Sequence, residues 1–249
     1  CRYFRSSSLI LKAEEAMRYS VAVFSLVFLG FTGGEPVKQI SLEYNSRILE
    51  KGKYITVAGE VYFRKSTGLM TTRLTRPFEM VTIVNSQGEV KIHDPSANTL
   101  VQNRSAMNSS EGSYLWHFLN GSYNDLGLAK TGYVIKTSKP EDGLMVTTWV
   151  PKQGFSSPIG KIELVHEKSL PVYIGYMDHQ GKMLGKMYFS AFTTSGDVVF
   201  PSKITEIMYR SLRDSVITTK SYSEPRINNE VDLKYLDYKI PANAKIVEQ

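Results

Sequence analysis

Hydrophobic and polar residues alternate along most of the chain after residue 50, a pattern typical of half-buried β-strands. In the stretch "YITVAGEVYFRK", Ile55, Val57, Gly59, Val61 and Phe63 share one parity and predict one face of a strand. The next strand-like stretches are broken at 76–77 (Arg-Pro) and at 85–88 (Asn-Ser-Gln-Gly), and a later one at 178–181 (Asp-His-Gln-Gly). The last two breaks are typical of hairpin turns, so we expect an antiparallel meander.

One segment has the spacing of a helix instead. In 108–121, "NSSEGSYLWHFLNG", Asn108 and Glu111 resemble a capping box and Gly121 fits a helix C-terminus. Four bulky apolar residues of this segment share one face at helical spacing: Tyr114, Leu115, Phe118 and Leu119. The sequence predicts a short amphipathic helix here and a further helical turn at 124–130.

The two ends of the β region are harder to assign. The stretch 37–51 has no clean period and fits either a short helix or an opening strand. Near the C-terminus, "DLKYLDYKI" predicts one last strand, which Pro241 stops because proline cannot donate to a ladder.

The N-terminal region has the pattern of an export signal. Residues 17–36 begin with Met-Arg, continue with the largely apolar run 19–31, and end in small residues, which predicts cleavage before Glu35. The run is shorter than the about 20 residues of a membrane span, although an uncleaved anchor is the alternative. We therefore expect an unstructured upstream extension at 1–16, a Sec-type signal peptide or anchor at 17–34, and one β domain at 35–249.

Composition narrows the function classes. The net charge is +6, from 30 basic and 24 acidic residues, and the basic residues are spread along the chain without a long run. A nucleic-acid binder usually concentrates them on one face, so we expect no nucleic-acid partner. Cys1 is the only cysteine, which excludes disulfides, thiol catalysis and thiolate metal sites from 35–249.

Candidate catalytic residues are few. The four histidines lack the i, i+4 spacing of a helical zinc pair, and no nucleophile elbow, phosphate loop or dinucleotide motif occurs. We interpret His93-Asp94, before Pro95, as the end of a strand, because Asp and Pro both favour turns. We expect no enzyme, no metal and no cofactor. The alternative is a secreted hydrolase using His166 with Glu163 or Glu167.

The segment 59–101, "GEVYFRKSTGLMTTRLTRPFEMVTIVNSQGEVKIHDPSANTLV", resembles the outer-membrane lipoprotein carrier (LolA-like) family. The likeness rests on an opening strand followed by basic residues, on Thr-x-Pro and Asp-Pro strand ends, on a hairpin turn, and on "YKIPANAKIV" at 238–247. The resemblance implies a mainly β fold: an incompletely closed antiparallel β-barrel, or half-barrel, with a short helical lid over an apolar cavity.

The resemblance also implies a function. It is that of a periplasmic carrier or chaperone-like protein that binds acyl chains of lipoproteins or other lipids for transport toward the outer membrane, with transport partners in the inner and outer membranes. An acyl chain gains about 0.8 kcal/mol per buried CH₂, so a cavity can hold it in water. The alternative is an envelope sensor or assembly factor of the same fold that acts through a protein partner.

The resemblance assigns candidate ligand-binding residues. The predicted cavity residues are Val61, Phe63, Met70, Leu74, Val81, Ile83 and Ile92. The predicted lid residues are Tyr114, Leu115, Phe118 and Leu119. Either Arg64 or Lys65 is expected to be the basic residue that contacts the lid. For each apolar residue, the alternative is plain core packing.

Overall fold

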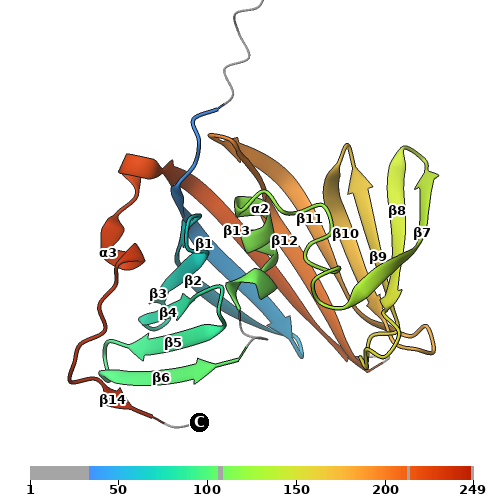
Figure 1. Cartoon of the computed structure of the whole chain (residues 1–249). Helices are drawn as coiled ribbons and strands as arrows, with labels where there is room; N and C mark the ends of the chain where they lie inside the picture. Colours follow the sequence, from blue (N-terminus) through green and yellow to red (C-terminus); the bar gives the residue numbers. More distant parts are fainter. Residues whose placement is uncertain (1–33, 106–108, 212–213, 248–249) are drawn as a thin grey trace, which may run out of the picture. The chain divides into compact units, whose positions relative to one another are not determined.

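Fourteen strands form one sheet in the part of the chain that the computed structural model describes, residues 34–105, 109–211 and 214–247 (Figure 1). They are β1 (Gln39–Glu50), β2 (Lys53–Arg64), β3 (Leu69–Arg76), β4 (Met80–Val84), β5 (Glu89–Asp94), β6 (Thr99–Arg104), β7 (Tyr133–Glu141), β8 (Leu144–Pro151), β9 (Lys161–Glu167), β10 (Leu170–Met177), β11 (Met183–Ser195), β12 (Val198–Ser211), β13 (Asp214–Ile227) and β14 (Lys245–Ile246). The predicted extension at 1–16 and the signal segment up to residue 33 lie outside the described residues.

The sheet is antiparallel throughout, except that β14 pairs with β6 in parallel. Its order is β14-β6-β5-β4-β3-β2-β1-β13-β12-β11-β10-β9-β8-β7, with β14 and β7 at the two ends. The sheet therefore curves without closing, and the predicted open half-barrel is confirmed. The stretch 37–51 is a strand rather than a helix, because β1 pairs along its length with β2 and β13 in the middle of the sheet.

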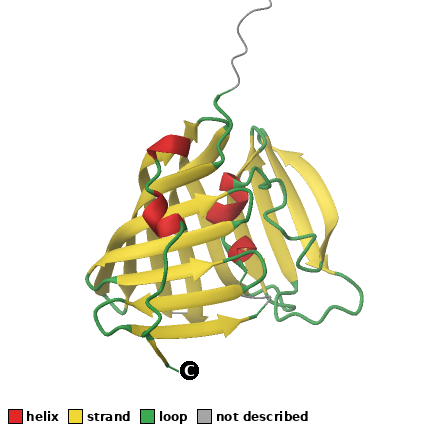
Figure 2. Ribbon diagram, turned by 60° about the vertical axis from the view of Figure 1, so that its left-hand side comes forward, coloured by secondary structure: helices red, strands yellow, loops and turns green. Residues whose placement is uncertain are grey.

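The strand order explains where a lid can form. β6 and β7 follow one another in the chain but lie near opposite ends of the sheet, so the link between them has to cross a face of the sheet. This link holds the 3-10 helix η2 (Ser110–Gly112) and the helix α2 (Tyr114–Leu119). Figure 1 shows α2 in front of the middle strands, with the sheet curving around it, and Figure 2 shows the same arrangement from the side.

The predicted helix at 108–121 is shorter and interrupted. The Ser109 side chain accepts a hydrogen bond from the Glu111 N–H and caps η2, whereas Asn108 lies outside the described residues. Ser113 then takes an extended conformation, with φ −87° and ψ 126°, so that α2 begins only at Tyr114. The further helical turn expected at 124–130 is wrong, since those residues form hydrogen-bonded turns.

The last strand expected near the C-terminus is also wrong. After η3 (Asn228–Glu230), the chain forms the short helix α3 (Leu233–Leu236). The Asp232 side chain accepts a hydrogen bond from the Lys234 N–H at the start of α3, and such a cap stabilises a helix over a strand. None of the helices in the described part of the chain is long and apolar enough to span a bilayer.

Two hydrophobic clusters lie on opposite faces of the sheet. The larger one joins α2 to strands β1–β3 and β7–β13 and includes Phe63, Phe118 and Phe189. The smaller one packs α3 and the following residues against β2 through Tyr62, Tyr235 and Leu236. We call the face that α2 covers the α2 face.

Candidate functional site

The register of the first strands places five predicted cavity residues on the α2 face. Phe63 of β2 is the direct cross-strand partner of Met70 of β3. On the neighbouring strands, Val61 pairs with Thr72, Thr72 pairs with Thr82, and Thr82 pairs with Ile92. Directly paired residues point to the same face of a sheet. Leu74 shares that face by alternation from Met70.

Val81 and Ile83 lie on the opposite face, so their predicted place in the cavity is wrong. Val81 pairs with His93, whose ring contacts Tyr238 of the C-terminal segment. Ile83 lines a groove of about 720 Å³ between the sheet and that same segment. The prediction failed because β4 is apolar at four of its five positions, which leaves its parity open.

Arg64 and Lys65 pair with acidic residues away from α2. Arg64 Nη1 donates a hydrogen bond to Asp237 Oδ1 at 2.9 Å, which ties β2 to the residue that ends α3. Lys65 Nζ lies 3.7 Å from Asp197 Oδ2, in the turn before β12. Arg64 therefore contacts the C-terminal segment and not the predicted lid.

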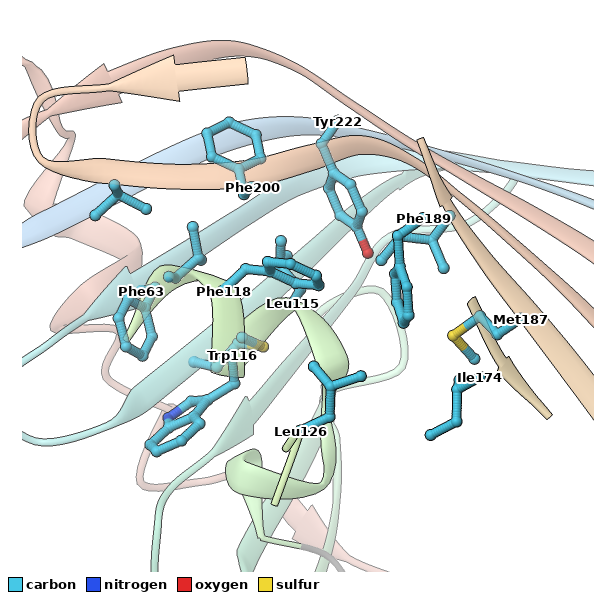
Figure 3. Close-up of a cluster of buried hydrophobic side chains, with 14 of the residues drawn as sticks. Phe63, Leu115, Trp116, Phe118, Leu126, Ile174, Met187, Phe189, Phe200 and Tyr222 are labelled. Carbon is cyan, nitrogen blue, oxygen red and sulfur yellow. The ribbon is translucent and has the colours of Figure 1, made fainter. Parts of the chain in front are cut away.

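The four predicted lid residues all pack toward the sheet. Phe118 is fully buried, with none of its surface exposed, and its ring meets Phe189 of β11 at a centroid distance of 5.3 Å. Tyr114 contacts the ring of Phe189 at 5.7 Å. Leu115 (Figure 3) is buried in the same cluster, as is Leu119. The side chains of α2 thus occupy the apolar concavity in which the sequence placed a ligand cavity.

Sequence reasoning missed Trp116, a residue of α2 that contacts β2. Its ring meets Phe63 edge to face at 6.5 Å, and its indole Nε1 is buried without a hydrogen-bond partner. The helical spacing of the four lid residues had placed Trp116 off the apolar face. A buried donor without a partner is costly in free energy.

Polar contacts fix the N-terminal side of this link. Ser110 Oγ donates to the Gly68 carbonyl at 2.7 Å, and Ser109 Oγ donates to the Ser86 carbonyl at 3.0 Å. On the other side, His117 Nδ1 lies 3.3 Å from Ser122 Oγ. Burial lowers the pKa of His117 and keeps its ring neutral near pH 7. The link is thus attached at its first end to the turns that follow β2 and β4.

A cavity of about 320 Å³ opens beside α2. Tyr114, Ile204 and Tyr222 line it together with two charged residues, Glu206 of β12 and Lys220 of β13. Lys220 Nζ lies 3.7 Å from Glu206 Oε2. Burial raises the pKa of Tyr114, and the negative charge of Glu206 raises it further, so that the phenol keeps its proton. Burial likewise raises the pKa of Tyr222.

Beyond this cavity the α2 face continues as a partly exposed apolar surface. Ile48 pairs with Ile55 across β1 and β2, and Met208 pairs with Val216 across β12 and β13. Ile55 is 52% exposed and Met208 is 44% exposed. We call these four residues the rim. The sequence pattern had placed Ile55 on the same strand face as Val61 and Phe63. Nothing in that pattern indicated that α2 leaves the rim residues uncovered.

The pairing proposed for a hydrolase does not form. Side chains alternate along β9, so His166 shares the face of Leu164, while Glu163 and Glu167 point to the other face. Burial lowers the pKa of His166. Among the described residues, no three His, Cys, Asp or Glu side chains lie close enough to hold a metal ion.

The strand-end interpretation of His93-Asp94 is confirmed. Asp94 Oδ1 accepts hydrogen bonds from the N–H groups of Ser96 at 2.9 Å and Ala97 at 3.0 Å, and so closes the turn between β5 and β6. His93 is buried, and its Nδ1 lies 2.8 Å from the Tyr238 hydroxyl.

No family model matches the chain, and no curated protein matches it. Solved structures do. A DUF1329 family protein from Desulfovibrio piger has a TM-score of 0.57 and 13% identity over 94% of this chain and 98% of its own. A putative outer membrane lipoprotein-sorting protein domain from Vibrio parahaemolyticus has a TM-score of 0.56 and 11% identity, covering 89% of this chain and 94% of its own.

A LolA superfamily protein from Nitrosomonas europaea has a TM-score of 0.53 and 11% identity over 82% of this chain and 92% of its own. The fold is LolA-like. At this level of identity the likeness concerns the fold, and function has to be argued from the site itself.

Proposed function

We propose that this protein is a periplasmic carrier that binds acyl chains of a lipid or lipoprotein on the α2 face and performs no chemistry on them. One observation carries the proposal. A six-residue helix covers an apolar sheet face with its own apolar side chains, and that face continues past the helix as an uncovered rim. An apolar patch that stays partly exposed to water is a feature of binding sites.

The proposed mechanism is an exchange of apolar partners. An acyl chain enters over the rim and takes the place of the α2 side chains against residues such as Ile204 and Phe189. The chain gains about 0.8 kcal/mol for each CH₂ that leaves water, and this gain has to offset the cost of exposing the apolar side chains of α2. α2 would swing about its attachment at Ser109 and Ser110, as lids of other proteins do.

The proposed location follows from the N-terminal sequence. The segment 17–34 would direct export, with either cleavage before Glu35 or retention as an anchor. Transport toward the outer membrane would then involve a donor partner in the inner membrane and an acceptor in the outer membrane.

A second candidate is an envelope sensor or assembly factor that acts through a protein partner. The observation that favours it is β7, the end strand of the sheet, which is exposed at every position after Tyr133. An end strand offers unpaired backbone groups to which a partner strand can add.

Native mass spectrometry tests the two candidates together. The full chain is expressed in a bacterial envelope, and the purified protein is analysed before and after lipid extraction. The carrier proposal predicts a co-purifying acyl species, whereas the sensor predicts a bound protein. A matched pair of variants locates the site. Ile55→Lys changes a rim residue that is 52% exposed, and Tyr54→Lys changes its neighbour, 57% exposed on the other face.

The carrier proposal expects Ile55→Lys to lose the acyl species and Tyr54→Lys to keep it. Equal occupancy in both variants would place the lipid elsewhere on the molecule. A protein without lipid that also fails to take up added lipopeptide would contradict the carrier function.

A further inference from the structure

A pair of opposite charges lies within the apolar α2 face. Glu206 follows Ile204 by two residues along β12, and Lys220 precedes Tyr222 by two along β13, so both point to the side of α2. The side chains of Glu206 and Lys220 are 29% and 34% exposed. Both line the cavity of about 320 Å³ beside Tyr114.

The position of this pair is unusual for charged groups. On one side along the strands lie the residues that α2 covers, and on the other lie the rim residues Met208 and Val216. The direct cross-strand partners of Glu206 are Met187 and Thr218, and both charged side chains are partly exposed to water. The ammonium and carboxylate are 3.7 Å apart, beyond the distance of a direct hydrogen bond. The ammonium therefore keeps donors, and the carboxylate keeps acceptor positions, for a bound molecule.

We infer that Glu206 and Lys220 bind the headgroup of a zwitterionic phospholipid, with Lys220 on the phosphate and Glu206 on the ammonium. This inference rests on the proposed function, because the acyl chains of the same molecule occupy the rim and the concavity under α2. The two charges match the two charges of a phosphoethanolamine group. A headgroup with a phosphate and no amine leaves Glu206 facing a like charge, so the pair also selects against anionic lipids.

The experiment compares three lipids with identical acyl chains: a phosphatidylethanolamine, a phosphatidylglycerol and a diacylglycerol. Uptake by the full-length exported protein from mixed micelles is measured by native mass spectrometry. The expected preference for phosphatidylethanolamine over phosphatidylglycerol is about tenfold, the size of one charge-assisted hydrogen bond. Phosphoethanolamine without acyl chains should not compete, because the apolar contacts supply most of the binding.

Two substitutions separate the roles of the two residues. Glu206→Gln removes the preference between the two phospholipids, and Lys220→Met weakens both of them relative to diacylglycerol. Lys203→Met, on the other face of β12, is the control and should change none of the three.

The outcomes separate the inference from the function on which it rests. Equal uptake of all three lipids by the unaltered protein would overturn the headgroup site and leave the acyl carrier intact. A phospholipid preference that survives both Glu206→Gln and Lys220→Met would overturn it as well. Uptake of none of the lipids would overturn the carrier function itself.

Discussion

The rings of Phe118 and Phe189 meet edge to face, with their centroids 5.3 Å apart. One belongs to α2 and the other to β11, and both are buried. This contact makes α2 a part of the hydrophobic core as well as the cover of the α2 face. The folded protein is more stable with α2 against the sheet, whereas the proposed ligand binds when α2 has moved away. The Phe118–Phe189 contact therefore stabilises the fold and opposes ligand binding.

Weakening this contact should therefore improve binding while it lowers stability. Phe118→Leu is expected to cost about 1 kcal/mol of unfolding free energy. If the ligand displaces α2, the same change raises acyl-chain affinity by up to about fivefold, since less free energy holds the covered state. Urea unfolding and titration with a fluorescent fatty acid measure the two effects.

Phe200→Leu is the control for that substitution. Phe200 is buried in the same cluster but lies on β12, so it should lose stability without gaining affinity. If Phe118→Leu binds the fatty acid more weakly, α2 contacts the ligand directly and is not displaced by it.

Gly127, in the link after α2, is a position where a side chain does not fit. Its φ is +78°, and a Cβ there would lie 2.8 Å from His117 Cε1. Gly127→Ala should destabilise the protein by about 1 kcal/mol from the left-handed backbone and about 1–3 kcal/mol from overpacking. Gly143→Ala isolates the first contribution, because φ there is +80° and a Cβ meets nothing within 4 Å. Equal losses in urea unfolding would show that His117 moves aside freely.

Stability should fall on mild acidification because of His117 and His166. Burial lowers the pKa of His117 and His166 below the ordinary value of 6.5. Below pH 6.5 the unfolded chain binds protons that the folded chain excludes, so stability present above that pH is lost as the pH falls. The loss ends below the folded pKa values, and its slope is at most about 1.4 kcal/mol per pH unit for each histidine.

Urea unfolding between pH 5 and 7 measures this slope. His117→Gln should make it shallower, and adding His166→Gln should reduce it again. An unchanged slope in the double variant would assign the acid sensitivity to other groups.

The C-terminal segment should contribute stability without affecting the ligand site. Tyr235 of α3 lies 5.3 Å from the ring of Tyr62 and 5.9 Å from that of Tyr238, with Arg73 over its face at 4.7 Å. Tyr235→Ala is expected to lower the unfolding free energy by about 3 kcal/mol and to expose residues 233–247 to proteases. Because this cluster lies on the face opposite α2, fatty-acid affinity should stay the same under conditions where the variant is folded.

The alternation of apolar and polar residues predicted the fold well. It failed where both faces of a strand are apolar. From Ile55 to Phe63, polar neighbours mark one face of β2, and the predicted face is the observed one. In β4, Met80, Val81, Ile83 and Val84 leave both faces apolar. The three residues between β3 and β4 reset the parity, and a one-residue shift exchanges the two faces.

Local polar contacts explain the other failures. The segment 233–240 alternates like a strand, but the Asp232 cap and the pairing of Arg64 with Asp237 fix a helix there. Neither interaction can be predicted from the spacing of apolar residues along the chain. The Glu206–Lys220 pair was missed for a similar reason, since two charged residues 14 positions apart become neighbours only through the β12–β13 register.

Quenching of Trp149 by a brominated acyl chain tests the central claim most directly. The chain has two tryptophans, and Trp116→Phe leaves Trp149, buried in the floor of the α2 face with its Nε1 bonded to Thr147 Oγ1 at 3.0 Å. A chain that binds on this face should quench the emission of Trp149 in proportion to lipid uptake, whereas the same lipid without bromine should not. Uptake of the brominated lipid with undiminished Trp149 emission would contradict binding on the α2 face.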